Sequence, residues 1–123
     1  MTRSKPRNLL REELKVLNQF LCLEISLKDL RDKLVDVLEF DFEGDKPWLN
    51  GHFITPEPGI RVEKWHIENA LDKKRLGLIS ERELEEWASV ILMCLAYDIE
   101  ENADHDLIAD WLNDLGFNLR RSE

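Results

Sequence analysis

The stretch that most constrains the fold is LDKKRLGLISERELEEWA, which runs from Leu71 to Ala88. Gly77 follows a helical pattern, and glycine readily takes the left-handed conformation that ends many helices. Ser80 offers a side-chain cap for a following helix, and Glu83, three residues later, completes a capping box. The stretch therefore predicts a helix, a tight turn and a second helix, with the turn setting the angle between them.

The same stretch has part of the spacing of a helix–loop–helix calcium site. Asp72, Gly77 and Glu83 occupy the first, sixth and twelfth places of such a loop. The third and fifth places need oxygen ligands, but they hold Lys74, which is a cation, and Leu76, which is apolar. The spacing is therefore explained by capping, and the sequence predicts no metal and no cofactor.

Apolar residues recur at three- and four-residue steps along most of the chain, which is typical of amphipathic helices. Ser26 is a natural cap for the second of these segments. At 123 residues the chain has the size of one domain. We expect a single, mainly α domain over 1–123, with about five helices packed as an irregular bundle. The expected helical segments are 7–25, 27–40, 62–76, 81–99 and 107–115.

The segment from Asp41 to Ile60 differs from the rest, because it holds most of the prolines and glycines of the chain. Such a composition predicts a loop-rich connection. Two alternatives stay open for it. Phe40 and Phe42 pair with Phe53 in a short β-hairpin around GDKPWLNG, or the segment is an irregular loop with a functional role.

Four tryptophans are many for a chain of this length. Trp65, Trp87 and Trp111 fall on apolar helix faces, which predicts that they pack in the core. Leu71 and Leu76 lie on the same predicted face as Trp65. Trp48 is in the loop-rich segment, where it either packs beneath the loop or serves as a binding hot spot.

The cysteines and the N-terminus bear on the cellular compartment. Cys22 and Cys94 fall on apolar helix positions, which favours two free thiols in a reducing cytoplasm over a disulfide. No apolar run approaches the ~20 residues of a membrane helix. The N-terminus is basic but lacks the apolar segment and cleavage site of a secretory signal. We expect a cytoplasmic protein that does not bind membranes, with a mobile basic tip over 1–8.

The net charge is −9, and the acids are unevenly distributed. Arg82 is the one base between Glu81 and Asp114. An acidic field repels phosphate backbones and attracts basic proteins, so a basic protein partner is favoured and nucleic acid is not. The alternative is a solvated surface that keeps the protein soluble. The candidate partner-binding residues are Trp48, Asp98, Glu100, Glu101, Asp104, Asp106, Asp110 and Asp114.

The sequence contains no recognisable catalytic motif. His52, His66 and His105 are far apart in the chain, and the DHD run over 104–106 is explained by capping of the last helix. The sequence therefore favours a non-enzymatic protein. A small enzyme or ligand-binding protein is the alternative, with a pocket under the 41–60 segment and His52, His66 or Asp41 as its polar groups.

The pattern G-x-I-S-x-x-E-L-x-x-W-A over 77–88, with YDIE and DLIADWLNDLG downstream, resembles a group of small acidic bacterial proteins of unknown function. Its residues are capping and core residues, so the resemblance implies a fold. Proteins of this size and charge also resemble bacterial immunity proteins, which implies a non-enzymatic module that blocks a basic toxin. A homodimer that uses the apolar N-terminal helix is a further alternative.

Overall fold

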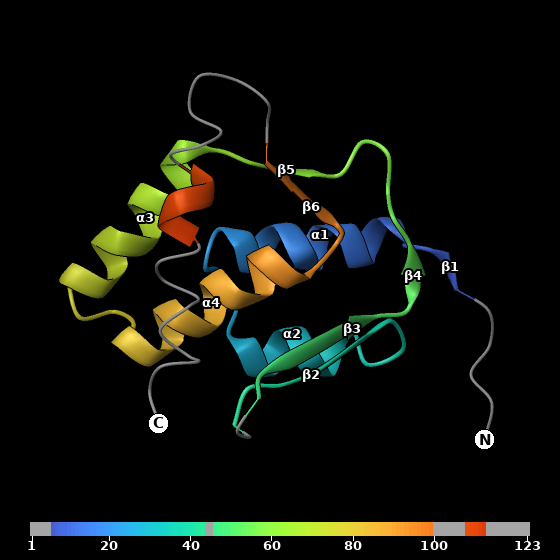
Figure 1. The fold of residues 1–123 in the computed structure, drawn as a ribbon, viewed down its shortest axis with the longest axis horizontal. Coiled ribbons are helices and arrows are strands. Elements are labelled where there is room, and N and C mark those ends of the chain that lie inside the picture. The colour runs from blue at the N-terminus through green and yellow to red at the C-terminus, as the bar shows by residue number, and fades with distance from the viewer. Residues whose placement is uncertain (1–5, 44–45, 100–107, 113–123) are drawn as a thin grey trace.

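A computed structural model describes residues 6–43, 46–99 and 108–112 of the chain. Pairs of helices and groups of short strands follow one another along it (Figure 1). The helices are α1 (Arg11–Leu21), α2 (Leu27–Lys33), α3 (Lys64–Arg75) and α4 (Glu81–Met93), and residues 108–112 are also helical. The strands are β1 (Arg7–Asn8), β2 (Leu38–Asp41), β3 (Trp48–Gly51), β4 (Phe53–Ile54), β5 (Ile60–Val62) and β6 (Tyr97–Ile99).

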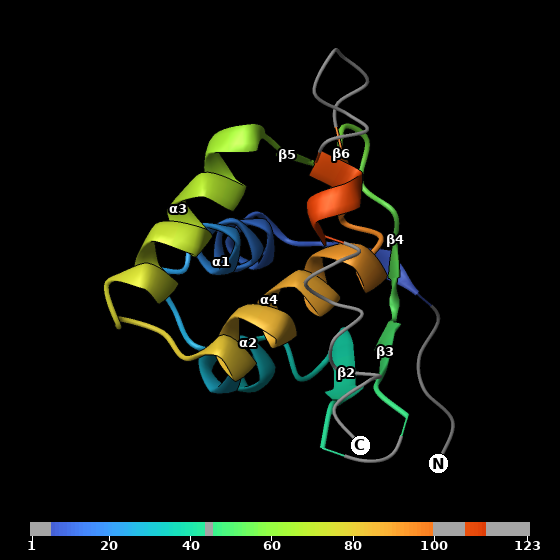
Figure 2. The same cartoon turned by 60° about the vertical axis from the view of Figure 1, so that its left-hand side comes forward.

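Helices α1, α2 and α4 form the middle of the molecule, and α3 packs beside α4 (Figures 1 and 2). Three two-stranded sheets surround these helices. Strands β1 and β4 are parallel, with Arg7 opposite Phe53. Strands β2 and β3 form an antiparallel hairpin, and β5 and β6 form a parallel pair in which Ile60 lies opposite Tyr97. The β1–β4 and β5–β6 pairs therefore join segments that are distant in the sequence.

The prediction of a mainly α bundle is wrong, because the described residues form an α/β mixture with 49% helix and about 19% strand. The predicted helices were too long. Residues 7–8, 38–40, 62 and 97–99 lie in predicted helices but form β1, most of β2, the end of β5 and β6, respectively. Strands of two to four residues are too short to show the alternation that identifies a strand. Their apolar residues therefore continue the helical spacing of the preceding segment.

A hairpin does form near the loop-rich segment, but it begins earlier than expected. Phe40 pairs with Leu49, and Asp41 pairs with Trp48. Phe53, the predicted partner of Phe40, pairs instead with Arg7 of β1. The strand partner changes at His52. Residues 48–51 pair with β2, and residues 53–54 pair with β1.

The core lies between the helices and the inner faces of the sheets. Trp87 of α4 is 1% exposed, and its indole Nε1–H donates to the carbonyl of Leu21 at 3.2 Å. The Tyr97 hydroxyl, which is also buried, donates to the carbonyl of Leu17. The other large side chains that are fully buried are Phe42, Leu17, Leu21, Leu30, Leu34, Ile67, Ile108, Leu112, Val37, Val62 and Val90.

The outer face of α3 differs from the prediction. Trp65 is 51% exposed, and Leu71 and Leu76 are also exposed. The helix turns Ile67 and Ala70 toward the core instead. These two positions lie one helical turn apart and form the buried stripe, so the predicted apolar face was rotated away from the true one.

The turn between α3 and α4 confirms the capping prediction. Gly77 has φ of +77°, and its N–H donates to the carbonyl of Lys74 at 3.0 Å. The Ser80 hydroxyl accepts from the Glu83 N–H, and the Glu83 carboxylate accepts from the Ser80 N–H, both at 3.0 Å. Both helix ends at this turn therefore have satisfied backbone groups.

The cysteines of the described chain are free thiols. Cys94 is buried, and Cys22 is half-buried. Burial raises the pKa of the Cys94 thiol to about 11. None of the helices formed by the described residues is long and apolar enough to cross a membrane.

Candidate functional site

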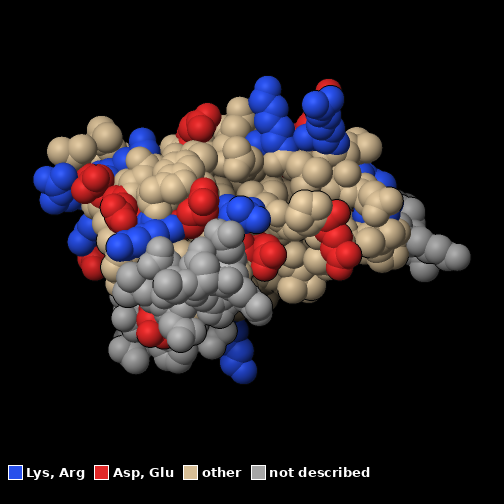
Figure 3. All heavy atoms as spheres, turned by 90° about the horizontal axis from the view of Figure 1, so that it is seen from above, with Lys and Arg blue, Asp and Glu red and all other residues tan. Residues whose placement is uncertain are grey.

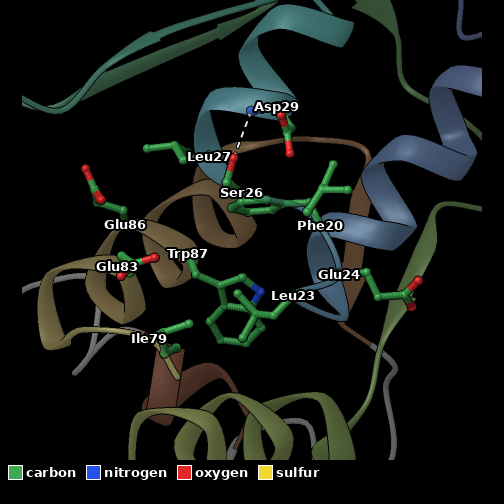
Figure 4. Close-up of a pocket in the computed structure, with 11 residues that line it drawn as sticks. Phe20, Leu23, Glu24, Ser26, Leu27, Asp29, Ile79, Glu83, Glu86 and Trp87 are labelled. Carbon is green, nitrogen blue, oxygen red and sulfur yellow. Dashed lines mark hydrogen bonds between the residues drawn. The ribbon is translucent and has the colours of Figure 1, made fainter. Parts of the chain in front are cut away.

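A pocket of about 260 Å³ opens where the end of α1 meets the starts of α2 and α4 (Figure 4). It combines an apolar interior with carboxylates. The apolar lining residues are Phe20, Leu23, Ile25, Leu27, Ile79 and Trp87, and the polar ones are Glu24, Ser26, Asp29, Glu83 and Glu86. This volume is below the usual range for drug-sized ligands, so it suits one or two side chains.

One wall of the pocket is the turn that connects α1 to α2. Leu23 has φ of +58°, which is a left-handed conformation that costs a leucine about 1–2 kcal/mol. Its N–H donates to the carbonyl of Phe20 at 2.9 Å, as in a helix C-terminal cap. The Asn69 side chain of α3 donates to the carbonyl of Cys22 at 3.2 Å and braces the turn. The turn therefore places an apolar side chain at the pocket where glycine would place none.

The floor of the pocket is Trp87. Figure 4 shows its indole beside Leu23 and above Ile79. The hydrogen bond from Nε1 to Leu21 fixes the indole to the last turn of α1. Phe20 is also buried and lines the pocket from α1. An apolar group that enters the pocket would therefore meet preformed aromatic surface.

The carboxylates come from three segments. Asp29 lies in the first turn of α2, and Glu83 and Glu86 lie in the first two turns of α4. The Glu83 carboxylate is held by its bond to the Ser80 N–H. Burial raises the pKa of the Glu86 carboxyl, and Arg82 acts in the opposite direction from 3.8 Å. The Glu24 carboxylate points away from the centre of the pocket (Figure 4).

Among the described residues that line the pocket there is no lysine, arginine or histidine. Arg82, the neighbour of Glu86, uses its guanidinium to donate to the carbonyl of Phe42 at 2.6 Å. The Ser26 hydroxyl accepts from the Asp29 N–H at 3.1 Å and caps α2. The described lining residues therefore offer negative charge beside an apolar floor, and their one serine, Ser26, serves as the cap of α2.

Comparison with protein-family models, with curated proteins and with solved structures gave no match to this chain. The resemblance of residues 77–88 to small acidic bacterial proteins therefore stays a prediction. Any proposal about function must be built on the geometry of the described residues.

The predicted partner-binding residues lie elsewhere. Trp48 is 44% exposed on β3, and Asp98 lies opposite Arg61 in the β5–β6 pair. Asp110 is exposed on the 108–112 helix. Strands β3 and β6 belong to different sheets, so the structure does not bring Trp48 and Asp98 into one sheet. The remaining predicted residues lie outside the described part of the chain: Glu100, Glu101, Asp104, Asp106 and Asp114.

The polar groups of the alternative ligand site are also separate from the pocket. The pocket takes no lining residue from 41–60, and neither His52 nor His66 lines it. The Asp41 carboxylate accepts from the Glu43 N–H at 2.9 Å within the hairpin turn. Over 6–43, 46–99 and 108–112, no three His, Cys, Asp or Glu side chains converge in a way that could hold a metal ion.

His66 has a structural role at the start of α3. It is buried, and its Nδ1 accepts from the Glu63 N–H at 2.9 Å, which caps the helix. Its ring also lies 3.7 Å from the ring of Trp65, measured between centroids. Burial lowers the pKa of the imidazole from 6.5, and Glu63 acts in the opposite direction. Protonation of Nδ1 would remove the acceptor that caps α3.

We therefore expect the contribution of His66 to stability to fall as the pH falls from 7 to 5. Below pH 6.5 the unfolded chain binds a proton at His66 more readily than the folded chain does. The free energy of unfolding therefore decreases as the pH decreases. The slope from one such group is at most about 1.4 kcal/mol per pH unit. The measurement is urea unfolding at several pH values.

The matched control is His66→Gln, because glutamine keeps an acceptor at this capping position and does not titrate. This variant should show a smaller slope than the natural chain between pH 5 and 7. Glu86, whose raised pKa gives a slope of the opposite sign, is present in both proteins and cancels in the comparison. Equal slopes in the two proteins would contradict this role for His66.

The pocket itself was not identified from the sequence. The capping box explains Glu83 in the sequence without any pocket. A signal was present, because Glu83, Glu86 and Trp87 have the i, i+3, i+4 spacing of one helix face. Nothing in the sequence indicated the left-handed turn at Leu23, since leucine is disfavoured in that conformation.

Proposed function

We propose that the protein is a non-enzymatic binding module that holds a basic segment of a partner protein in the pocket between α1, α2 and α4. One observation carries this proposal. Every charged residue in the described lining of the pocket is an acid, and the other lining residues are apolar except for Ser26. Lysine and arginine match this arrangement, because each joins an apolar stem to a cationic end.

The chemistry of the lining favours binding over catalysis. Nucleophilic catalysis needs a nucleophile that is free to react, and the one hydroxyl among the described lining residues, Ser26, caps α2 by accepting from the Asp29 N–H. The aromatic floor is rigid, because Trp87 is buried and hydrogen bonded at its far edge. A preformed pocket loses little freedom when a side chain enters, which favours affinity.

The resemblance to immunity proteins suggests the sharpest form of the proposal. A protein of this kind would block a basic bacterial toxin by covering part of its surface. The net charge of −9 would speed the encounter with such a partner. The predicted partner residues Trp48, Asp98 and Asp110 lie on other elements and stay a separate prediction.

A peptide that alternates leucine and lysine is a suitable probe, and a leucine–glutamate peptide is its negative control. We expect the first peptide to bind, and binding to weaken at ~0.5 M salt, where charges are screened within a few ångströms. The double variant Asp29→Asn/Glu86→Gln should bind about tenfold more weakly, since each exposed ion pair contributes up to ~1 kcal/mol. Isothermal titration calorimetry measures both effects.

The matched control is Asp32→Asn/Glu81→Gln. These two acids lie on the same helices, α2 and α4, are exposed, and do not line the pocket. This variant removes the same charge and should bind the peptide almost as tightly as the natural chain. If the two double variants weaken binding equally, the pocket is not the binding site and the proposal fails.

A further inference from the structure

The last turn of α3 and the residues that follow it carry the chemical groups that the pocket lacks. Leu76 and Leu78 are 64% and 66% exposed, on either side of Gly77. The three preceding residues, 73–75, are Lys, Lys and Arg. We call residues 73–78 the basic turn. It joins cationic side chains to exposed apolar ones, which is the composition that the pocket suits.

The basic turn and the pocket are neighbours. Ile79, the residue after the turn, lines the pocket, as does Glu83 one helical turn further on. Yet Leu78 is exposed, so the turn does not fill the pocket of its own chain. Lysine and arginine side chains project at the left-hand end of the molecule in Figure 3, where Figure 1 places the end of α3. The turn is therefore presented outward beside a pocket of complementary character.

From this complementarity we infer that the partner segment held in the pocket is the basic turn of a second copy of this chain. The inference rests on the proposed function of the pocket. A two-fold axis near Ile79 would place each basic turn over the pocket of the other copy. Such an isologous arrangement satisfies both contacts at once and closes the assembly as a dimer.

The charges of the basic turn are available for this contact. Arg75 pairs with Asp72 at 3.1 Å, and both side chains are largely exposed. Within the described residues no ion pair involves Lys73 or Lys74, and Lys74 is exposed. In the dimer these lysines would meet Asp29 and Glu86, while Leu76 and Leu78 would cover the apolar floor.

Charge reversal tests the inference. Sedimentation equilibrium at low salt should show a dimer of the natural chain that weakens as salt is raised. The turn variant Lys73→Glu/Lys74→Glu and the pocket variant Asp29→Lys/Glu86→Lys should each dimerise at least tenfold more weakly, because two like-charged contacts arise in each homodimer. Mixing the two variants should restore dimers, because both contacts of the heterodimer then join opposite charges.

The matched control, Lys15→Glu/Lys64→Glu, reverses two exposed lysines on α1 and at the far end of α3, and it should dimerise like the natural chain. A natural chain that is monomeric up to ~1 mM overturns the inference, as does a mixture of variants that stays monomeric. If a monomeric chain still binds the leucine–lysine peptide in its pocket, the proposed function survives and only the second copy is rejected. If it binds neither, both proposals fail.

Discussion

Replacing Trp87 by alanine is expected to lower the free energy of unfolding by about 3–5 kcal/mol. The indole is 1% exposed and contributes both to the core and to the floor of the pocket. Its loss leaves a large cavity and also leaves the Leu21 carbonyl without its donor. Small domains have a total stability of about 5–15 kcal/mol, so this variant should be partly unfolded at 37 °C. Urea unfolding followed by circular dichroism gives the value.

Two further variants separate the causes. Trp87→Phe keeps most of the apolar volume and loses the hydrogen bond, so we expect a smaller cost of about 1–3 kcal/mol. Trp65→Ala removes an exposed tryptophan and should cost less than about 1 kcal/mol. If Trp65→Ala were as destabilising as Trp87→Ala, the placement of the two side chains would be wrong.

Replacing Glu13 by alanine is expected to cost about 2 kcal/mol of the free energy of unfolding. The Glu13 carboxylate accepts from the Leu10 N–H at 2.7 Å, which caps α1. It also accepts two hydrogen bonds from the Arg7 guanidinium, each at 2.8 Å. Glu13 is nearly buried, but Arg7 is 42% exposed, so solvent screening reduces the contribution of the pair. Glu12→Ala, at the exposed neighbouring position, is the control and should be nearly neutral.

The effect of Glu13 should depend on pH. The hydrogen bonds from Arg7 hold the pKa of the Glu13 carboxyl below 4.5. A group with a lowered folded pKa stabilises fully above its unfolded pKa, and that stability is lost as the pH falls through the folded pKa. The gap between the natural chain and Glu13→Ala should therefore be largest at neutral pH and narrow in acid. A gap that widens in acid would contradict the ion pair.

Local signals in the sequence predicted the helix ends better than the architecture. Gly77, Ser80 and Glu83 act through neighbouring backbone atoms, so their roles follow from residues within one turn. Ser26 likewise caps α2 as expected. These signals depend on residue type and short spacing alone, and both are visible in the sequence.

The strands could not be predicted in the same way, because they depend on distant partners. Tyr97 is a strand residue only because Ile60 lies beside it. The prediction of the apolar face of α3 was wrong for a related reason. Trp65, Leu71 and Leu76 have helical spacing, but the choice of the buried stripe is made by the elements that pack against α3.

The candidate pocket depends both on local spacing, which the sequence shows, and on contacts between distant segments, which it does not. Glu83, Glu86 and Trp87 share a helix face that the sequence can show. Their meeting with Leu23 and Asp29 depends on the packing of α1 and α2 against α4. Acids spread along 98–114 were the stronger signal in the sequence, because a run of charge is visible without any knowledge of packing.

The parallel pairing of β5 with β6 has a consequence for the folding of the chain. Both helices of the α3–α4 unit lie between these strands in the sequence, so the pair forms only after the chain has closed a long loop. Local helices form quickly, whereas contacts across a long loop must overcome its closure entropy. During synthesis Val62 emerges well before its partner Ile99. The β5–β6 sheet should therefore be among the last parts of the nascent protein to assemble.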